Sequence, residues 1–230
     1  MNISRRQALT SLGFATFASQ ITGLTALANS ETSSPKISSK LAIRYLQEGN
    51  QRYVQQQALR PRQGQQTRLK IAKGQTPFAI VLGCADSRVA PETIFDQGLG
   101  DLFVIRVAGN IVDDVVLGSI QFAVAEFGVA AIMVLGHERC GAVIAALDVA
   151  ENSTVLPGSI SALVEPILPA AREARTRTGD IVDIAVRLNV RNTVYKLKSD
   201  PLLKEFLEKG QLQVVGGRYD LESGLVGFIA

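Results

Sequence analysis

The chain has 230 residues, of which 47% are apolar and 20% are charged. This composition is typical of a globular protein with one sizeable core or, at most, two small ones. The formal net charge of +3 comes partly from the first 28 residues, which contain two Arg and no acidic residue. The nearly neutral remainder argues against a nucleic-acid or membrane-surface partner.

The N-terminus has the features of an export signal. Arg5 and Arg6 form a twin-arginine pair, residues 11–28 carry no charge, and Ala26-Leu27-Ala28 offers small residues for cleavage. The pattern resembles a Tat-type signal peptide over residues 1–28 and predicts export to the periplasm or an equivalent extracytoplasmic compartment, such as a thylakoid lumen. A membrane anchor is the alternative, but polar residues dilute the apolar run, so we expect no stable membrane insertion after cleavage.

The rest of the chain predicts one α/β domain over residues 40–230, after a flexible linker at residues 29–39. A helical rhythm from Lys40 to about Gln57 predicts an N-terminal helical arm. The elements expected after it alternate: strands at 78–83, 102–109 and 130–136, helices at 91–96, 111–128 and 141–150, further helices to about 209, and strands at 212–217 and 224–229. This order predicts a mainly parallel central sheet flanked by helices, with a C-terminal edge strand and hairpin.

The first apolar run ends in residues that carry chemistry. Phe78 to Gly83 has the pattern of a strand buried on both faces, and Cys84, Asp86 and Arg88 follow it directly. In open α/β sheets, functional groups lie just past the carboxyl ends of such strands. Because alternate residues of an extended chain point to one side, we expect these three side chains to converge.

A second apolar run, at residues 130–136, leads into His137 and Cys140. The chain contains one His and two Cys in total, so all three lie at predicted strand ends. Thiolate sulfur and imidazole nitrogen are preferred ligands of Zn²⁺, and the pattern therefore predicts a zinc site. The alternatives are a polar His with ordinary hydrogen bonds, Cys residues that pack as small hydrophobes, and a disulfide, which an exported protein can form.

The candidate zinc ligands are Cys84, Asp86, His137 and Cys140. With all four bound, the tetrahedral site is closed. If Asp86 is released, three ligands and one open position remain, which is the composition of a catalytic zinc site. Arg88 offers the released carboxylate a charge-assisted, bidentate partner. We interpret the C-x-D-x-R spacing as a switch between a closed and an open metal site.

Two motifs carry a family resemblance. Cys84-Ala-Asp-Ser-Arg88 and Gly136-His-Glu-Arg-Cys-Gly141 together resemble the signature of the β-class carbonic anhydrases. The similarity extends from about Leu41 to Ile229, including an R-V-A-G-N turn that begins at Arg106 and a G-x-Y-D-L ending. It implies a zinc lyase (carbonate dehydratase) that reversibly hydrates CO2 to bicarbonate and a proton through zinc-bound hydroxide.

The same resemblance assigns roles to individual residues. It implies zinc ligation by Cys84, His137 and Cys140, and a catalytic dyad of Asp86 and Arg88. It also implies substrate binding by residues that match the family's Gln and aromatic positions, which are Gln75, Phe103 and Phe122. At the position of Phe122 the family often has Tyr, and the Tyr hydroxyl is therefore missing from this chain. Some members of the family close the site when bicarbonate binds at a second position that includes a Trp. This chain has Gln75 and no Trp, so it resembles the members whose site is always open.

The resemblance further implies a homodimer or a homotetramer, with the N-terminal helices embracing the partner. Two other functions stay open. A zinc hydrolase of another small linear substrate, such as carbon disulfide, would share the metal chemistry. A non-catalytic envelope protein stabilised by zinc would need a permanently closed site, against which the Asp86–Arg88 spacing argues. A dinucleotide-binding fold is excluded because the lone G-x-G at Gly98 is followed by Phe103 where the fingerprint needs Gly.

Overall fold

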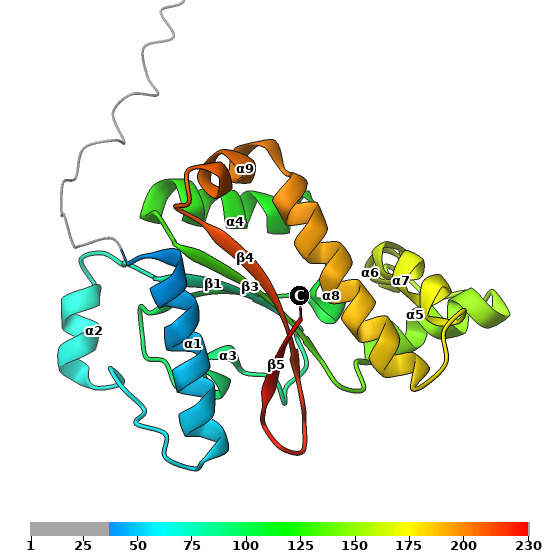
Figure 1. Cartoon of the computed structure of the whole chain (residues 1–230), viewed down its shortest axis with the longest axis horizontal. Helices are drawn as coiled ribbons and strands as arrows, with labels where there is room; N and C mark the ends of the chain where they lie inside the picture. The colour runs from blue at the N-terminus through cyan, green and yellow to red at the C-terminus, as the bar shows by residue number, and fades with distance from the viewer. Residues whose placement is uncertain (1–36, 230) are drawn as a thin grey trace, which may run out of the picture. The chain divides into compact units, whose positions relative to one another are not determined.

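The computed structural model describes residues 37–229, so the expected signal at residues 1–28 and most of the expected linker lie outside the described residues. In this part of the chain, five strands form one sheet in the order β2-β1-β3-β4-β5 (Figure 1). Neighbouring strands are parallel, except that β4 and β5 pair antiparallel. The predicted α/β fold, with a mainly parallel sheet and a C-terminal hairpin, is confirmed.

The elements alternate as a parallel sheet requires, because each parallel pair of strands needs a crossover connection. The strands are β1 (Ala79–Gly83), β2 (Leu102–Arg106), β3 (Ala131–His137), β4 (Gln213–Tyr219) and β5 (Val226–Ile229). The α-helices are α1 (Ser39–Val54), α2 (Gln65–Ile71), α3 (Pro91–Ile94), α4 (Asp114–Phe127), α5 (Gly141–Asn152), α6 (Ile160–Val164), α7 (Leu168–Ala174), α8 (Ile181–Ser199) and α9 (Pro201–Glu208). Two 3₁₀ turns are η1 (Ala108–Asn110) and η2 (Glu165–Ile167). Between residues 37 and 229, no helix has the length and apolar character needed to cross a membrane.

Helices cover both faces of the sheet. Side chains of β1 alternate between the faces: Ala79 and Val81 pack in one apolar cluster with α1 and α3, whereas Ile80 and Leu82 pack in another with α4, α8 and α9. The N-terminal arm thus buries the apolar side of α1 on its own sheet. A third cluster is formed mainly by α5, α7 and the first half of α8, whose ribbons are seen together in Figure 1. It contains Cys84 and Cys140. This cluster forms the apolar surroundings of the two thiols.

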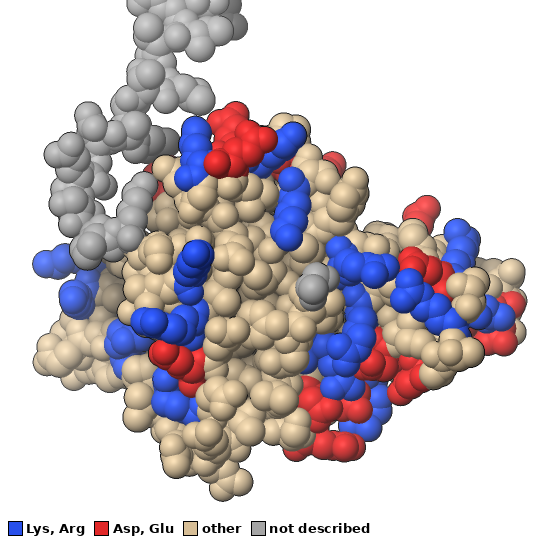
Figure 2. Space-filling view, in the orientation of Figure 1, with Lys and Arg blue, Asp and Glu red and all other residues tan. Residues whose placement is uncertain are grey.

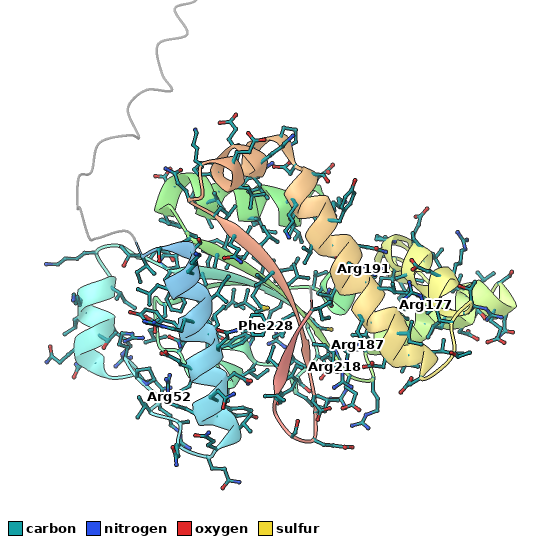
Figure 3. All side chains as sticks on the ribbon, viewed as in Figure 1. Arg52, Arg177, Arg187, Arg191, Arg218 and Phe228 are labelled. Carbon is teal, nitrogen blue, oxygen red and sulfur yellow. The ribbon has the colours of Figure 1, made fainter. Side chains whose placement is uncertain are left out.

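Helix α8 lies close against the sheet because two strands have glycine beneath it. A Cβ on Gly136 of β3 or on Gly216 of β4 would lie 2.5 Å or 2.7 Å from a methyl group of Val190. An ion pair fixes the beginning of α8 as well, since Arg218 of β4 (labelled in Figure 3) donates to Asp183 at 2.8 Å. The first half of α8 is therefore held firmly next to the carboxyl ends of β3 and β4.

Strand β2 differs from the prediction of a buried strand at residues 102–109. It is shorter, its side chains are half-buried or exposed, and it forms one edge of the sheet. Apolar content alone did not distinguish this edge strand from a central one. In the single described chain, no strand pairs with its outer flank, which leaves backbone donors and acceptors for another partner.

Charged side chains of both signs are interspersed on the surface. Figure 2 shows Lys and Arg side chains close to Asp and Glu side chains on one face of the molecule. Several form ion pairs, among them Arg44 with Glu48 and Arg187 with Asp183. The expectation of no nucleic-acid partner rests on the near-neutral charge and stays a prediction.

Candidate metal centre

The sheet brings Cys84, His137 and Cys140 to one place. Cys84 follows β1 directly, and His137 is the last residue of β3, the parallel neighbour of β1. Cys140 is the N-cap of α5, three residues after His137. Their ligand atoms all lie within 4.8 Å of one another, and all three residues are buried. The convergence follows from topology, because parallel neighbouring strands end at the same edge of a sheet.

The imidazole of His137 is oriented as a metal ligand would be. Its ring is fully buried, and Nδ1 donates a hydrogen bond to the backbone oxygen of Glu138 at 2.9 Å. Nε2 then presents a lone pair, and among the described residues it has no hydrogen-bond partner. A buried polar atom without a partner is costly, and a metal ion would satisfy it. The donor set of two sulfurs and one nitrogen fits Zn²⁺.

The two thiols are free and close together, so they do not form the disulfide considered above. Their Sγ atoms are 3.9 Å apart. A hydrogen bond from the Cys140 thiol, helped by the backbone N–H of Gly109, lowers the pKa of the Cys84 thiol well below its usual value despite its burial. The pKa of the Cys140 thiol rises because it shares that hydrogen bond with Cys84 and because it is buried. The shared hydrogen bond therefore favours a single thiolate on the pair, and a thiolate is the form of cysteine that binds metal.

Asp86 and Arg88 form a bidentate pair beside these ligands. Arg88 Nε donates to Asp86 Oδ1 at 2.9 Å, and Nη2 donates to Oδ2 at 2.7 Å. The hydrogen bonds from Arg88 hold the pKa of the Asp86 carboxyl well below its usual range. The carboxylate is therefore ionised and faces the guanidinium. Its Oδ2 atom still lies 4.0 Å from His137 Nε2, at the border of the ligand cluster.

Two features of this pair differ from the sequence-based expectation. The segment after Cys84 is a turn, with the N–H of Val89 donating to the Asp86 carbonyl at 3.0 Å, so an extended chain is not what makes Asp86 and Arg88 meet. Asp86 also stands outside the set of three mutually close ligands. Asp86 is thus paired with Arg88 in the structure, and both its ligation and the switch stay predictions.

Arg106 is a site residue that sequence reasoning did not single out. From the end of β2, its Nε donates to the carbonyl of Cys84 at 3.0 Å and its Nη2 to the carbonyl of Asp86 at 2.6 Å. It therefore braces the backbone of the C-x-D turn from the neighbouring strand. The available signal was its position at the end of a strand next to β1, within the turn that contributed to the family resemblance.

The expected substrate-binding residues do not gather around the ligands of the same chain. Gln75 is exposed in the loop before β1, whereas Cys84 follows the end of β1. Five strand residues separate these ends by about 16 Å. Phe103 pairs with Ile80 near the start of β2 and packs against Phe127, with ring centroids 6.1 Å apart. Phe122, on α4, is 54% exposed, and its ring centroid lies 5.5 Å from that of Phe127. These roles stay predictions.

The protein is thus of the α/β class, with two thiols and an imidazole at the carboxyl ends of neighbouring parallel strands, a ligand set that fits Zn²⁺. Solved β-carbonic anhydrases share this fold. A tetrameric enzyme from Sordaria macrospora has a TM-score of 0.66 at 27% identity, covering 82% of this chain and 96% of that one. The Coccomyxa enzyme, solved in complex with acetazolamide, has a TM-score of 0.64 at 29% identity, covering 79% and 83%.

The sequence comparisons agree with the fold. The family model described as carbonic anhydrase matches residues 79–226. Carbonic anhydrase 2 of Mycobacterium tuberculosis is 41% identical over 191 residues, which cover 83% of this chain and 92% of that protein. The chain belongs to the carbonic anhydrase family, in its β class.

Proposed function

We propose that the protein hydrates CO2 to bicarbonate and a proton, reversibly, with Zn²⁺ held by Cys84, His137 and Cys140. The observation that carries the proposal is the buried cluster of these three ligands, in which His137 Nε2 has no protein partner among the described residues. Bound zinc would lower the pKa of a coordinated water molecule to about 7, as it does in carbonic anhydrases generally. The protein residues hold the metal and orient the reacting oxygen.

Asp86 and Arg88 supply the orientation. Because Arg88 keeps the carboxylate ionised, Asp86 remains a hydrogen-bond acceptor at neutral pH, next to the ligand cluster. An acceptor in this position can fix the direction of the reacting oxygen's hydrogen and so aim its lone pair at CO2. The bidentate contact fixes the carboxylate itself, since both of its oxygens are held by one planar guanidinium.

The function is tested by stopped-flow CO2 hydration with the protein before and after zinc removal. We expect rapid hydration that a strong chelator abolishes and that one equivalent of Zn²⁺ per chain restores. The same preparations are assayed with carbon disulfide. If they hydrolyse carbon disulfide faster than they hydrate CO2, hydrolysis of carbon disulfide becomes the proposed reaction. A zinc-loaded protein with no hydration above buffer between about pH 7 and 9, where the active form of zinc enzymes prevails, would refute the proposal.

We also propose that a second copy of the chain completes the substrate pocket. One chain places Gln75 at the far end of β1 from its own Cys84, and it leaves the β2 edge unpaired. Related enzymes described as tetrameric support an assembly, either a dimer or a tetramer. In such an assembly, Gln75 and the aromatic residues Phe103 and Phe122 face the metal centre of the partner and bind substrate there.

Mixed oligomers distinguish a shared pocket from a pocket within one chain. Gln75→Ala and His137→Phe are each expected to have low activity alone, because one loses a substrate contact and the other a metal ligand. If Gln75 acts on the partner, co-expressed chains form mixed dimers with one intact site, and random mixing restores up to about a quarter of wild-type activity. Activity no greater than the sum of the two separate variants would contradict a shared pocket.

The export proposal rests on the sequence of residues 1–28. We propose that a Tat-type signal delivers the folded enzyme to the periplasm or an equivalent extracytoplasmic compartment. Metal coordination would protect the two free thiols there, because a thiolate bound to zinc is not available for oxidation. Fractionation of cells that express the native chain and a variant with both arginines replaced by lysine tests the location.

A further inference from the structure

A chain of two hydrogen bonds connects helix α8 to a metal ligand. The backbone N–H of Gly109 donates to Cys84 Sγ at 3.4 Å. The carbonyl of Gly109 accepts a hydrogen bond from Asn189 Nδ2 at 2.8 Å. Asn189 is only 3% exposed, and it comes from the middle of α8, far from Gly109 in sequence. One buried amide therefore reaches the residue that solvates the thiolate of Cys84.

The position of Gly109 needs such support. Its φ of 70° lies in the left-handed region, and a Cβ there would be 2.6 Å from Cδ1 of Ile167. A glycine fits this place, but it is also the residue with the greatest backbone freedom. The N–H that reaches Cys84 belongs to one peptide unit of Gly109, and the carbonyl held by Asn189 belongs to the next. Fixing that carbonyl restricts rotation at Gly109 and so keeps its N–H directed at the sulfur.

Helix α8 is a rigid support for this contact. Its residue Val190 sits over the glycines of β3 and β4, and Arg218 fixes Asp183 in its first turn. Asn189 is next to Val190 in the sequence, so the packing of Val190 on the two glycines also fixes the position of Asn189 relative to β3 and β4. Asn189 is buried and donates to the Gly109 carbonyl, so its action on the site is through Gly109 and not through contact with substrate.

We propose that Asn189 is a positioning residue of the metal centre: by holding Gly109, it keeps an N–H donor on the sulfur of Cys84 and thereby tunes and retains that ligand. The proposal rests on metal ligation by Cys84, which is part of the proposed function. Hydrogen bonds to a metal-bound thiolate draw electron density from the sulfur and restrict its movement. Without Asn189, the sulfur becomes a stronger electron donor on a looser turn.

Cobalt-substituted protein tests this directly, because the sulfur-to-cobalt charge-transfer band reports on the electron density of the thiolates. In Asn189→Leu, we expect this band to move to lower energy, and we expect zinc transfer to a chelator to become about 10–100-fold faster. Asn189→Asp, which keeps the size of the side chain but presents carboxylate oxygen to the Gly109 carbonyl, should change both readouts in the same direction. It serves as the deciding variant if Asn189→Leu does not fold.

Thr193→Val is the matched control. Thr193 is a buried polar residue one turn further along α8, with 7% exposure, and valine has nearly its shape. It should leave the band and the release rate unchanged, even if it lowers the melting temperature. A wild-type band and release rate in both Asn189 variants would overturn the proposal, whether or not CO2 hydration is intact. A wild-type protein that hydrates no CO2 but binds cobalt would refute only the proposed function, and one that binds no metal would overturn both.

Discussion

His137→Phe is expected to give a folded protein that does not retain zinc and hydrates CO2 at least about 10³-fold more slowly than the wild type, because nearly all of the rate depends on the metal. His137 is fully buried at the end of β3, and its Nε2 has no hydrogen-bond partner among the described residues. Phenylalanine preserves the ring and its packing but removes both nitrogens. Two sulfur ligands alone do not make a stable zinc site, which normally has at least three protein ligands.

Metal content and stability separate loss of the ligand from loss of the fold. The variant's zinc is measured after dialysis, and its melting temperature is compared with that of the metal-free wild type. We expect these two melting temperatures to be similar, since the variant also removes an unpartnered buried nitrogen and the hydrogen bond from Nδ1 to Glu138. Retention of one zinc per chain with high activity would show that the metal is held elsewhere.

Two physical rules account for most of the sequence-based prediction of the ligand cluster. Apolar runs that are buried on both faces belong to central parallel strands, and neighbouring parallel strands end at one edge. With one His and two Cys in the whole chain, their positions after two such runs left few alternatives. The pairing of β1 with β3 in the structure supplies the remaining fact, namely that the two ends are adjacent.

Contacts that depend on tertiary packing were not predictable in this way. The brace from Arg106 depends on β2 lying next to β1, and the burial of β2 was wrongly predicted because it is an edge strand. The contact from Asn189 depends on how closely α8 approaches the sheet, which glycines at residues 136 and 216 decide. No periodicity connects residues 80 positions apart, so sequence patterns could not indicate that Asn189 reaches Gly109.

Asp86 shows where a sequence pattern leaves a chemical choice open. The C-x-D-x-R spacing is compatible with four protein ligands or with three ligands and a carboxylate held by Arg88. In the structure, both oxygens of Asp86 are bound to the guanidinium, and the number of protein ligands to the metal stays a prediction. Oδ2 nevertheless lies 4.0 Å from His137 Nε2, so a modest rotation of the side chain brings it to the ligand cluster. Arg88 is the group that opposes this rotation.

Arg88→Ala is therefore expected to keep zinc but to lose most CO2 hydration. Without the bidentate partner, the Asp86 carboxylate is free to become the fourth ligand, which closes the position that water must occupy. The variant also loses the oriented acceptor, and the loss of oriented general acid–base assistance typically costs about 10²–10⁴-fold in rate. We expect one zinc per chain, a decrease of this size in kcat/KM, and a carboxylate oxygen in place of water as the fourth ligand, which the signal of the carboxylate carbon in X-ray absorption spectra reveals.

Arg88→Lys is the matched variant, because it keeps the positive charge but not the planar fork that holds both carboxylate oxygens. It should fall between the wild type and Arg88→Ala in kcat/KM, since a single point charge restrains Asp86 less well. Asp86→Asn in the Arg88→Ala background separates the two effects: the amide is a poor zinc ligand, so the carboxylate signal should disappear while activity stays low. If Arg88→Ala hydrates CO2 at the wild-type rate, Asp86 needs no partner to stay off the metal, and the interpretation of this pair as a switch fails.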